Sequence, residues 1–174
     1  MNIQAAIAQV VAGQSLSRAD METVMRTVMQ GEATEAQIGG LLVALSMKGE
    51  TIDEIVGAAS VMRSLATPVD IDTDGLIDLA GTGGDGANLF NVSTAATFVV
   101  AGAGGRIAKH GNRSVSSSSG SSDVLSALGV DLSVSPAAIA DSIASIGVGF
   151  MFAPMHHSAM KHAIGPRQQL AMRT

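Results

Sequence analysis

The sequence predicts an α/β protein in which a small N-terminal helical domain is hinged to a mainly parallel α/β domain, incomplete over these 174 residues. The first 66 residues contain four segments with apolar residues at helical spacing. From residue 72 onward, short apolar runs alternate with helical segments, a pattern typical of a parallel sheet. We therefore expect a helical domain over residues 1–67, to which the family resemblance described below assigns dimerisation and hinge motion. The first part of an α/β domain is expected over residues 72–174, with the last helix as a candidate to return to the helical domain.

Helix boundaries in the first domain are indicated by capping patterns. The first predicted helix carries Ile3, Ile7 and Val10 on one face and ends at Gly13. The next three begin with residue pairs at capping-box spacing, namely Ser17 with Asp20, Thr34 with Gln37, and Thr51 with Glu54. Gly31 and Gly49 stand where C-terminal caps are expected. Four helices with short connections predict a small bundle.

The elements of the second domain follow from short apolar runs and helix start signals. Thr67-Pro68 is a plausible crossing between the domains, because the residue before a proline disfavours the helical region. Strands are expected over residues 76–80, 106–109 and 148–152, and helices over 94–103, from Ser122 or Asp123 to 129, and over 136–147. Residues 156–173 are expected to be helical, with a break at Gly165-Pro166.

The composition excludes several classes of function. A hydrophobic fraction of 47% with 14% charged residues is that of a globular protein. The net charge of −5 argues against a general nucleic-acid surface, and the absence of Cys excludes thiolate nucleophiles and thiolate metal sites. The N-terminus lacks the basic start of a signal peptide, and the longest apolar run, residues 95–105, is shorter than the roughly 20 residues that span a membrane. We therefore expect a cytoplasmic protein that binds neither membranes nor nucleic acids.

Two polar loops follow the first two predicted strands. Residues 81–86 read GTGGDG, and residues 109–113 read KHGNR. Glycines let backbone N–H groups approach a phosphate, and Lys and Arg bind phosphates in different ways. Ligands of open α/β sheets bind beyond the carboxyl ends of the strands, so this pair of loops indicates a site for a phosphorylated anion. Taken alone, the first loop is equally compatible with a tight turn that binds no ligand, whereas for the second loop surface charge is the less favoured interpretation.

Several further polar residues have both a structural and a functional interpretation. Residues 91–94 (NVST) fit simple helix capping. They could also donate hydroxyl and amide hydrogen bonds to the same anion, with Ser93 Oγ as a Mg²⁺ ligand. For Ser93 alone, capping is the favoured interpretation. The serine-rich segment 114–122 is short and next to the basic cluster, which favours a loop around a diphosphate over a linker. The three histidines 156, 157 and 162 match no zinc pattern and are expected at helix surfaces or caps.

Taken in order, the motifs GTGGDG, NVST, KHGNRSVSS and GSSDVL resemble those of the anthranilate phosphoribosyltransferase family. The resemblance runs along the whole chain, including MQGEATEAQIGGLLVALSMKGET and the C-terminal GFMFAPMHHSAMKHAIGPRQQLAMRT. It implies a glycosyltransferase of tryptophan biosynthesis. Such an enzyme transfers the phosphoribosyl group of 5-phosphoribosyl 1-diphosphate (PRPP) to the amino group of anthranilate, releasing diphosphate. It also implies Mg²⁺ as cofactor and a homodimer formed through the helical domain.

The resemblance assigns roles to residues at matching positions. PRPP binding is implied for Gly81, Gly84, Asp85, Leu89, Asn91, Val92, Ser93, Thr94, Lys109, His110, Gly111, Asn112, Arg113, Ser114, Val115, Ser116, Ser117 and Ser121. Anthranilate binding is implied for Gly81, Asn112 and Arg167. Ser93 is implied as a metal ligand, and Lys109 as the group that stabilises the leaving diphosphate. No nucleophilic side chain is implied.

The chain departs from the family pattern in three ways. Leu89 stands where the family often has Thr, and Ser118 where it often has Lys. Family members also continue for about as many residues again, completing the sheet and carrying an Asp-Glu pair that binds Mg²⁺; this chain has no such pair after Asp85. We therefore expect a truncated or cleaved form with little activity of its own. Two alternatives stay open: a pyrimidine nucleoside phosphorylase of the same fold, which Asn112, Arg113 and Arg167 disfavour, and a non-enzymatic nucleic-acid-binding relative.

Overall fold

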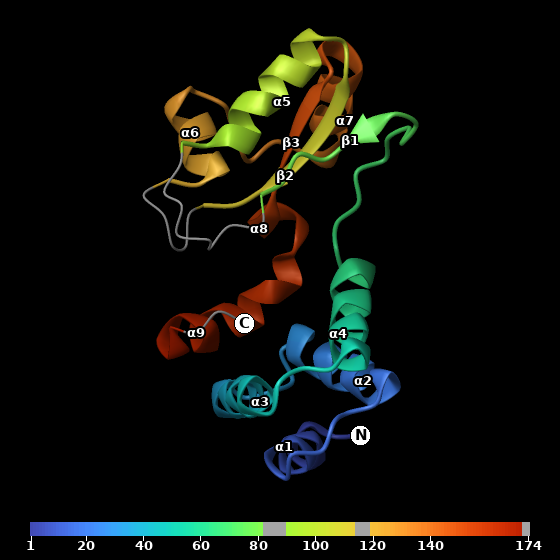
Figure 1. The fold of residues 1–174 in the computed structure, drawn as a ribbon, viewed down its shortest axis with the longest axis vertical. Helices are drawn as coiled ribbons and strands as arrows, with labels where there is room; N and C mark the ends of the chain where they lie inside the picture. The colour runs from blue at the N-terminus through green and yellow to red at the C-terminus, as the bar shows by residue number, and fades with distance from the viewer. Residues whose placement is uncertain (82–89, 114–118, 172–174) are drawn as a thin grey trace. The chain divides into compact units, whose positions relative to one another are not determined.

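The computed structural model describes residues 1–81, 90–113 and 119–171 (Figure 1). It confirms the predicted fold class, with an N-terminal helical region followed by helices that alternate with parallel strands. The chain divides into two compact units. One consists of Met1–Ala66 with His157–Thr174, and the other of Thr67–His156. No helix within the described ranges is long and apolar enough to cross a membrane.

The helical unit contains α1 (Ile3–Val11), α2 (Arg18–Met29), α3 (Glu35–Lys48), α4 (Ile52–Ser64), the short 3₁₀ helix η1 (Ser158–Met160) and α9 (Lys161–Leu170). Its apolar positions form one buried cluster. The members are Ile3, Ala6, Val10, Leu16, Met21, Val24, Val28, Met29, Ile38, Leu41, Ala44, Leu45, Val61 and Ala163. The helical spacing recognised in the sequence thus marks the face of each helix that is removed from water.

The capping boxes predicted at Thr34 and Thr51 are both confirmed, with the side chains of Gln37 and Glu54 bonding back to the N-cap residues. Ser17 also caps its helix, since its Oγ accepts a hydrogen bond from the Asp20 N–H at 3.1 Å. These bonds satisfy donors that a helix N-terminus leaves without partners.

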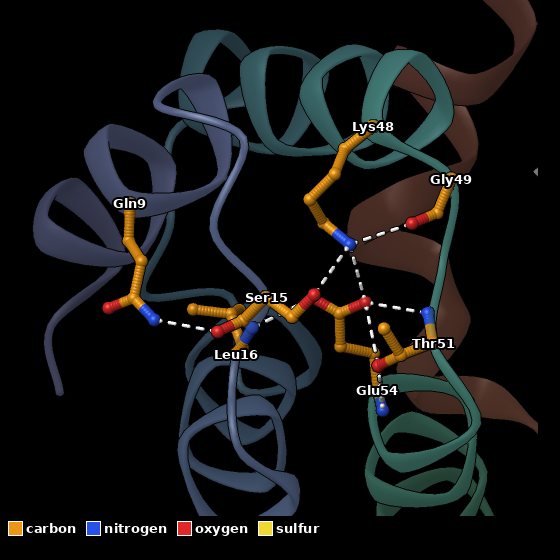
Figure 2. A network of polar contacts seen from close by, with 7 residues as sticks. All are labelled: Gln9, Ser15, Leu16, Lys48, Gly49, Thr51 and Glu54. Atoms are coloured by element: carbon orange, nitrogen blue, oxygen red, sulfur yellow. Dashed lines mark hydrogen bonds and ion pairs between the residues drawn. The ribbon is translucent and has the colours of Figure 1, made fainter.

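Glu54 also holds three parts of the helical unit together (Figure 2). Its Oε1 accepts from the Leu16 N–H at 2.8 Å, and its Oε2 accepts from the Thr51 N–H at 2.8 Å and from Lys48 Nζ at 2.9 Å. Lys48 Nζ also lies 3.3 Å from Ser15 Oγ and 2.7 Å from the Gly49 carbonyl oxygen. Glu54 is only 1% exposed. Burial alone would raise its pKa, but the hydrogen bonds from Lys48, Thr51 and Leu16 hold the pKa below its usual value.

The α/β unit is built on three parallel strands in the order β1 (Leu76–Ile77), β2 (Arg106–Gly111) and β3 (Val148–Phe152). Helices α5 (Val92–Gly102) and α7 (Pro136–Ile146) pack on opposite faces of this sheet (Figure 1). Ala108 faces Ile139 and Ile143 of α7, whereas the next residue, Lys109, faces the start of α5. Two short helices, α6 (Ser121–Ala127) and α8 (Ala153–His156), complete the unit.

Four elements differ from the prediction: β1, β2, α5 and α9. β1 is two residues long, because the Leu79 carbonyl is bonded by Lys109 Nζ instead of joining the ladder. β2 extends two residues further, to Gly111, and α5 begins two residues earlier, at Val92. The predicted break at Gly165-Pro166 is wrong, because α9 runs through it. Packing supports the helix there: Pro166 is buried, and a Cβ on Gly165 would lie 3.0 Å from Glu35 Oε1.

The predicted position of His156 on a helix surface is also wrong, because the residue is buried, at 5% exposure. Its Nδ1 lies 3.0 Å from the Thr67 carbonyl oxygen, and the Thr67 N–H donates to the His156 carbonyl oxygen at 2.8 Å. The first and last residues of the α/β unit are therefore bonded to each other.

Candidate functional site

The predicted site residues fall into three groups. Gly81, residues 91–94, residues 109–113 and Ser121 lie in the described part of the α/β unit. Arg167 lies in α9 of the helical unit. The remaining predictions lie outside the described residues: Gly84, Asp85, Leu89, Ser114, Val115, Ser116 and Ser117.

Lys109 is at the centre of the first group. It is 2% exposed, and its Nζ donates to the Leu79 carbonyl oxygen and lies 3.3 Å from Ser93 Oγ. These contacts join β2 to the segment after β1 and to the first turn of α5. Burial lowers the pKa of Lys109, an effect that the negative charge of Asp78 partly offsets. An ammonium has three donors, and these two contacts leave capacity for a third acceptor.

The segment after β1 is held along β2 by a hydrogen bond from the β2 backbone to the side chain of Asp78. The His110 N–H donates to Asp78 Oδ1 at 3.3 Å. Gly81, three residues further, is exposed, and a Cβ added to it would meet nothing within 4 Å. The segment after β1 therefore runs beside the carboxyl end of β2 at Asp78, and residues 82–86 of the first predicted loop lie outside the described residues.

Asn91 occupies the N-cap position of α5 but does not cap it. Its Nδ2 donates to the Ser119 carbonyl oxygen at 3.2 Å, and its Oδ1 accepts from Ser119 Oγ at 3.0 Å. The side chain thus ties the start of α5 to the far end of the serine-rich loop. Among the described residues, no side chain caps the N-terminus of α5, where the positive end of the helix dipole favours an anion.

Gly111, the last residue of β2, is closely packed. A Cβ on Gly111 would lie 2.8 Å from a ring carbon of Phe150, and still closer to Ser121 Oγ, so only glycine fits. Asn112 Oδ1 accepts from the Arg113 N–H at 2.8 Å. The Arg113 guanidinium lies 3.7 Å from Asp123 Oδ1 and 6.0 Å from the ring centroid of Phe152. In this conformation Asn112 and Arg113 thus contact the protein's own loop and neighbouring side chains.

Sequence reasoning missed four residues that shape this site: Asp78, Leu79, Ser119 and Asp123. Asp123 was expected near the start of α6, but it is the third residue of that helix, and its Oδ2 accepts from the Gly120 N–H at 2.7 Å. The three-residue spacing from Gly120 to Asp123 could have indicated this bond. No local signal marks Leu79, which takes part only through its backbone carbonyl.

The described residues do not make up a magnesium site by themselves. Ser93 Oγ, the predicted ligand, lies beside the Lys109 ammonium. Within the part of the chain that the structure describes, no group of three or more His, Cys, Asp or Glu side chains could hold a metal ion. Mg²⁺ prefers several hard oxygen ligands, and one hydroxyl does not supply them.

A cavity of about 310 Å³ opens on the α5 side of the sheet. Its lining includes Lys109 and Thr94, and α5 lines it as far as Gly102. Thr94 is 3% exposed, and its Oγ1 has no hydrogen-bond partner among the described residues. Most of the lining is apolar, including Phe98 and Ile146.

Two family models match the chain. The helical bundle domain of a glycosyl transferase family matches residues 4–66, and the a/b domain of that family matches residues 73–174. The chain belongs to this glycosyl transferase family. Both predicted regions therefore correspond to parts of one family architecture.

Individual members of the family are also similar to the chain in sequence and structure. A curated relative from Teredinibacter turnerae, named anthranilate phosphoribosyltransferase, is 68% identical over all 174 residues of the chain and 51% of its own length. The structure of anthranilate phosphoribosyltransferase from Thermus thermophilus is 44% identical, with a TM-score of 0.88 over 97% of this chain and 51% of that one. The Saccharomyces cerevisiae enzyme in complex with PRPP and Mg is 27% identical, with a TM-score of 0.88 over 99% of this chain and 52% of that one.

These comparisons confirm the resemblance stated from the motifs. They also show that the chain spans about half the length of the family members it matches.

Proposed function

We propose that the chain is the PRPP-binding half of an anthranilate phosphoribosyltransferase. The observation that carries this proposal is the buried Lys109 ammonium, placed beside Ser93 at the N-terminus of α5 and at the carboxyl ends of β1 and β2. A fixed cation next to a helix N-terminus favours a phosphorylated anion. The names of the curated relatives, and the PRPP and Mg in the yeast complex, support the choice of substrates.

Transfer of the phosphoribosyl group forms a bond between the anthranilate nitrogen and the anomeric carbon of PRPP, and it breaks the bond from that carbon to the diphosphate. Negative charge develops on the departing diphosphate. Lys109 would donate its third hydrogen bond to a diphosphate oxygen, in a setting where burial strengthens the interaction. Asn91 would act on the diphosphate through the serine-rich loop that it holds in place.

For the other half of the reaction, we propose that Asn112, Gly81 and Arg167 contribute to binding anthranilate. Arg167 would pair with the carboxylate, and Asn112 would first release the Arg113 N–H. Holding the weakly basic amine near the anomeric carbon would supply much of the rate enhancement, because no nucleophilic side chain is needed. Hinge motion at the Thr67 crossing would exclude water from the activated sugar.

Magnesium is proposed as the cofactor that neutralises charge on the diphosphate. Ser93 would contribute one oxygen ligand to the metal, and the diphosphate would contribute further oxygen ligands. The acidic pair implied by the family resemblance belongs to the half of the relatives that the chain does not span. We therefore expect little turnover from these 174 residues alone.

We also propose a cytoplasmic homodimer formed through the helical unit. Large apolar side chains are exposed near the Lys48–Glu54 pair: Met47 at the end of α3, and Ile52 and Ile55 in the first turns of α4. Such exposed large apolar side chains support an interaction surface on the helical unit.

Calorimetric titration of the 174-residue chain with PRPP and Mg²⁺ tests the substrate assignment. We expect saturable binding that Lys109→Met weakens about 10- to 100-fold, the range of a charge-assisted hydrogen bond. Lys161→Met, at the exposed first residue of α9, is the matched control and should leave affinity unchanged.

A folded sample that does not bind PRPP, or a Lys109→Met variant that binds as well as the wild type, would contradict the proposal. Phosphorolysis of thymidine would instead favour the nucleoside phosphorylase alternative. Salt-dependent binding of DNA would favour a nucleic-acid-binding protein.

A further inference from the structure

Helix α9 carries Arg167, and the ends of this helix do little to hold it in place. Among the described residues, no side chain caps its N-terminus at Met160. Its C-cap residue, Ala171, has a left-handed φ of 49°, which costs energy for any residue other than glycine. A short helix without good caps is marginal by itself, so the position of α9 depends on its contacts with the rest of the helical unit.

The apolar contacts of α9 are small. Ala163 and Pro166 are buried, and Ala163 belongs to the buried cluster of the helical unit. Arg167 follows Pro166 directly and is half-buried. A methyl group and a proline ring remove little area from water, so this face alone offers little resistance to rotation or sliding of the helix.

A larger side chain, that of His162, fills the space over the end of α2. Gly31 follows the C-cap of α2 with a left-handed φ of 78°, and a Cβ placed on it would lie 2.6 Å from His162 Cε1 and 2.7 Å from His162 Nδ1. The turn under the ring is closed by two backbone bonds. The Gly31 N–H donates to the Val28 carbonyl oxygen at 3.1 Å, and the Glu32 N–H donates to the Thr27 carbonyl oxygen at 3.0 Å. The rigid imidazole therefore packs on a well-defined surface.

A second close approach joins α9 to α3. A Cβ on Gly165 would lie 3.0 Å from Glu35 Oε1, at the first residue of α3. The contact of His162 with Gly31 and that of Gly165 with Glu35 restrain α9 against two different helices. Of these two contacts, only that of His162 is made by a bulky side chain of α9 itself.

We propose that the packing of His162 on Gly31 is a positioning contact that fixes α9, and through it the Arg167 guanidinium, for the carboxylate of anthranilate. This inference rests on the role proposed above for Arg167. Paired hydrogen bonds to a carboxylate require a narrow range of guanidinium positions. His162 precedes Arg167 by about 7.5 Å along the helix axis, so it acts through the helix and not by contact with the substrate.

Two variants disturb this contact. His162→Ala removes the ring, and Gly31→Ala adds a methyl group that forces the ring to move. Gly13→Ala is the matched control, because Gly13 follows the C-cap of α1 with a left-handed φ of 77°, but a Cβ there meets nothing within 4 Å. Both glycine variants therefore carry similar backbone strain, and only Gly31→Ala reaches α9. His162→Phe keeps a flat ring over Gly31 and tests rescue by shape.

The first readout is amide hydrogen exchange of α9, which does not depend on any substrate. We expect exchange in α9 to become at least about tenfold faster in His162→Ala and Gly31→Ala. In Gly13→Ala and His162→Phe it should stay close to that of the wild type. Unchanged exchange of α9 in His162→Ala, or equal effects of Gly31→Ala and Gly13→Ala, would overturn the proposal.

The second readout is the affinity for anthranilate of the chain saturated with PRPP and Mg²⁺. Anthranilate is itself fluorescent, and the chain has no Trp or Tyr to interfere. We expect His162→Ala and Gly31→Ala to weaken anthranilate binding about tenfold, with the affinity for PRPP unchanged and with His162→Phe close to the wild type. Faster exchange of α9 with wild-type affinity for anthranilate would overturn the positioning role.

Arg167→Met separates a failure of this inference from a failure of the proposed function. If Arg167→Met weakens anthranilate binding and His162→Ala does not, the role of Arg167 stands and the positioning role is wrong. If Arg167→Met leaves the affinity unchanged, or the wild type binds no anthranilate, the role of Arg167 is wrong and the positioning role falls with it.

Discussion

Lys109 shows how one residue organises the candidate site. Its side chain leaves β2 on the α5 face and reaches the Leu79 carbonyl and Ser93, so a single ammonium contacts two other chain segments. Its burial would keep water from competing with the proposed anion, and the same burial lowers the pKa of the Lys109 ammonium. The predicted role of Lys109 toward diphosphate stays a prediction, and the geometry adds a positioning role for the same side chain.

In the helical unit, Glu54 likewise joins several chain segments through its side chain. Replacing it in the variant Glu54→Gln would leave Lys48 buried at 8% exposure without a charged partner, and would weaken the bonds to Leu16 and Thr51. We expect the free energy of unfolding at pH 7 to fall by about 3 kcal/mol in urea denaturation. The control is Glu22→Gln, which removes a surface ion pair with Arg18 and should cost less than about 1 kcal/mol. Equal losses in the two variants would contradict the assignment.

The stabilisation by Glu54 should depend on pH. The folded pKa of Glu54 is lowered, so its contribution to stability is fully present above the unfolded value of about 4.3 and is lost as the pH falls through the folded pKa. The difference in unfolding free energy between wild type and Glu54→Gln should therefore shrink below about pH 4.3. A difference that stays constant down to acid unfolding would argue against an ionised Glu54.

At the scale of elements, the close approach of α2 and α4 depends on one glycine. A Cβ on Gly57 of α4 would lie 2.7 Å from the Arg18 carbonyl oxygen and 3.0 Å from Met21 Cβ. Gly57→Ala should therefore separate the helices and destabilise the protein by about 1–3 kcal/mol, although alanine is the better helix former. Gly40→Ala, at an exposed position in α3 with nothing within 4 Å of its Cβ, should instead stabilise by about 0.5–1 kcal/mol. Thermal unfolding of both variants checks the opposite signs; a stabilised Gly57→Ala would refute the close packing.

At the scale of the whole molecule, the two units have unequal cores. The large buried cluster of the helical unit contrasts with that of the α/β unit, where the described members are Ala108, Ile139 and Ile143, and with the open cavity beside α5. We expect calorimetry to resolve two unfolding transitions, with the α/β unit melting first. PRPP with Mg²⁺ should raise only the first transition, and Glu54→Gln should lower only the second. A single transition whose calorimetric and van't Hoff enthalpies agree would show that the units unfold together.

Local pattern alone determined most elements of this protein. Helical spacing and the pairs Thr34–Gln37 and Thr51–Glu54 located the helices, and apolar runs located the strands, because both depend on neighbours a few residues away. The order of the polar loops after β1 and β2 indicated the family, which the comparisons confirmed.

Only the tertiary structure decided which side chains meet. Glu54 bonds Leu16 across 38 residues, Asn91 bonds Ser119 across 28, and Pro166 is accepted inside α9 because packing supports the helix. Burial and hydrogen-bond partners arise from segments distant in the sequence, so a local pattern carries no record of them. For that reason the sequence could propose candidate site residues, which stay a prediction, whereas it could not show the burial of Lys109 or the hydrogen bonds from Asn91 to Ser119.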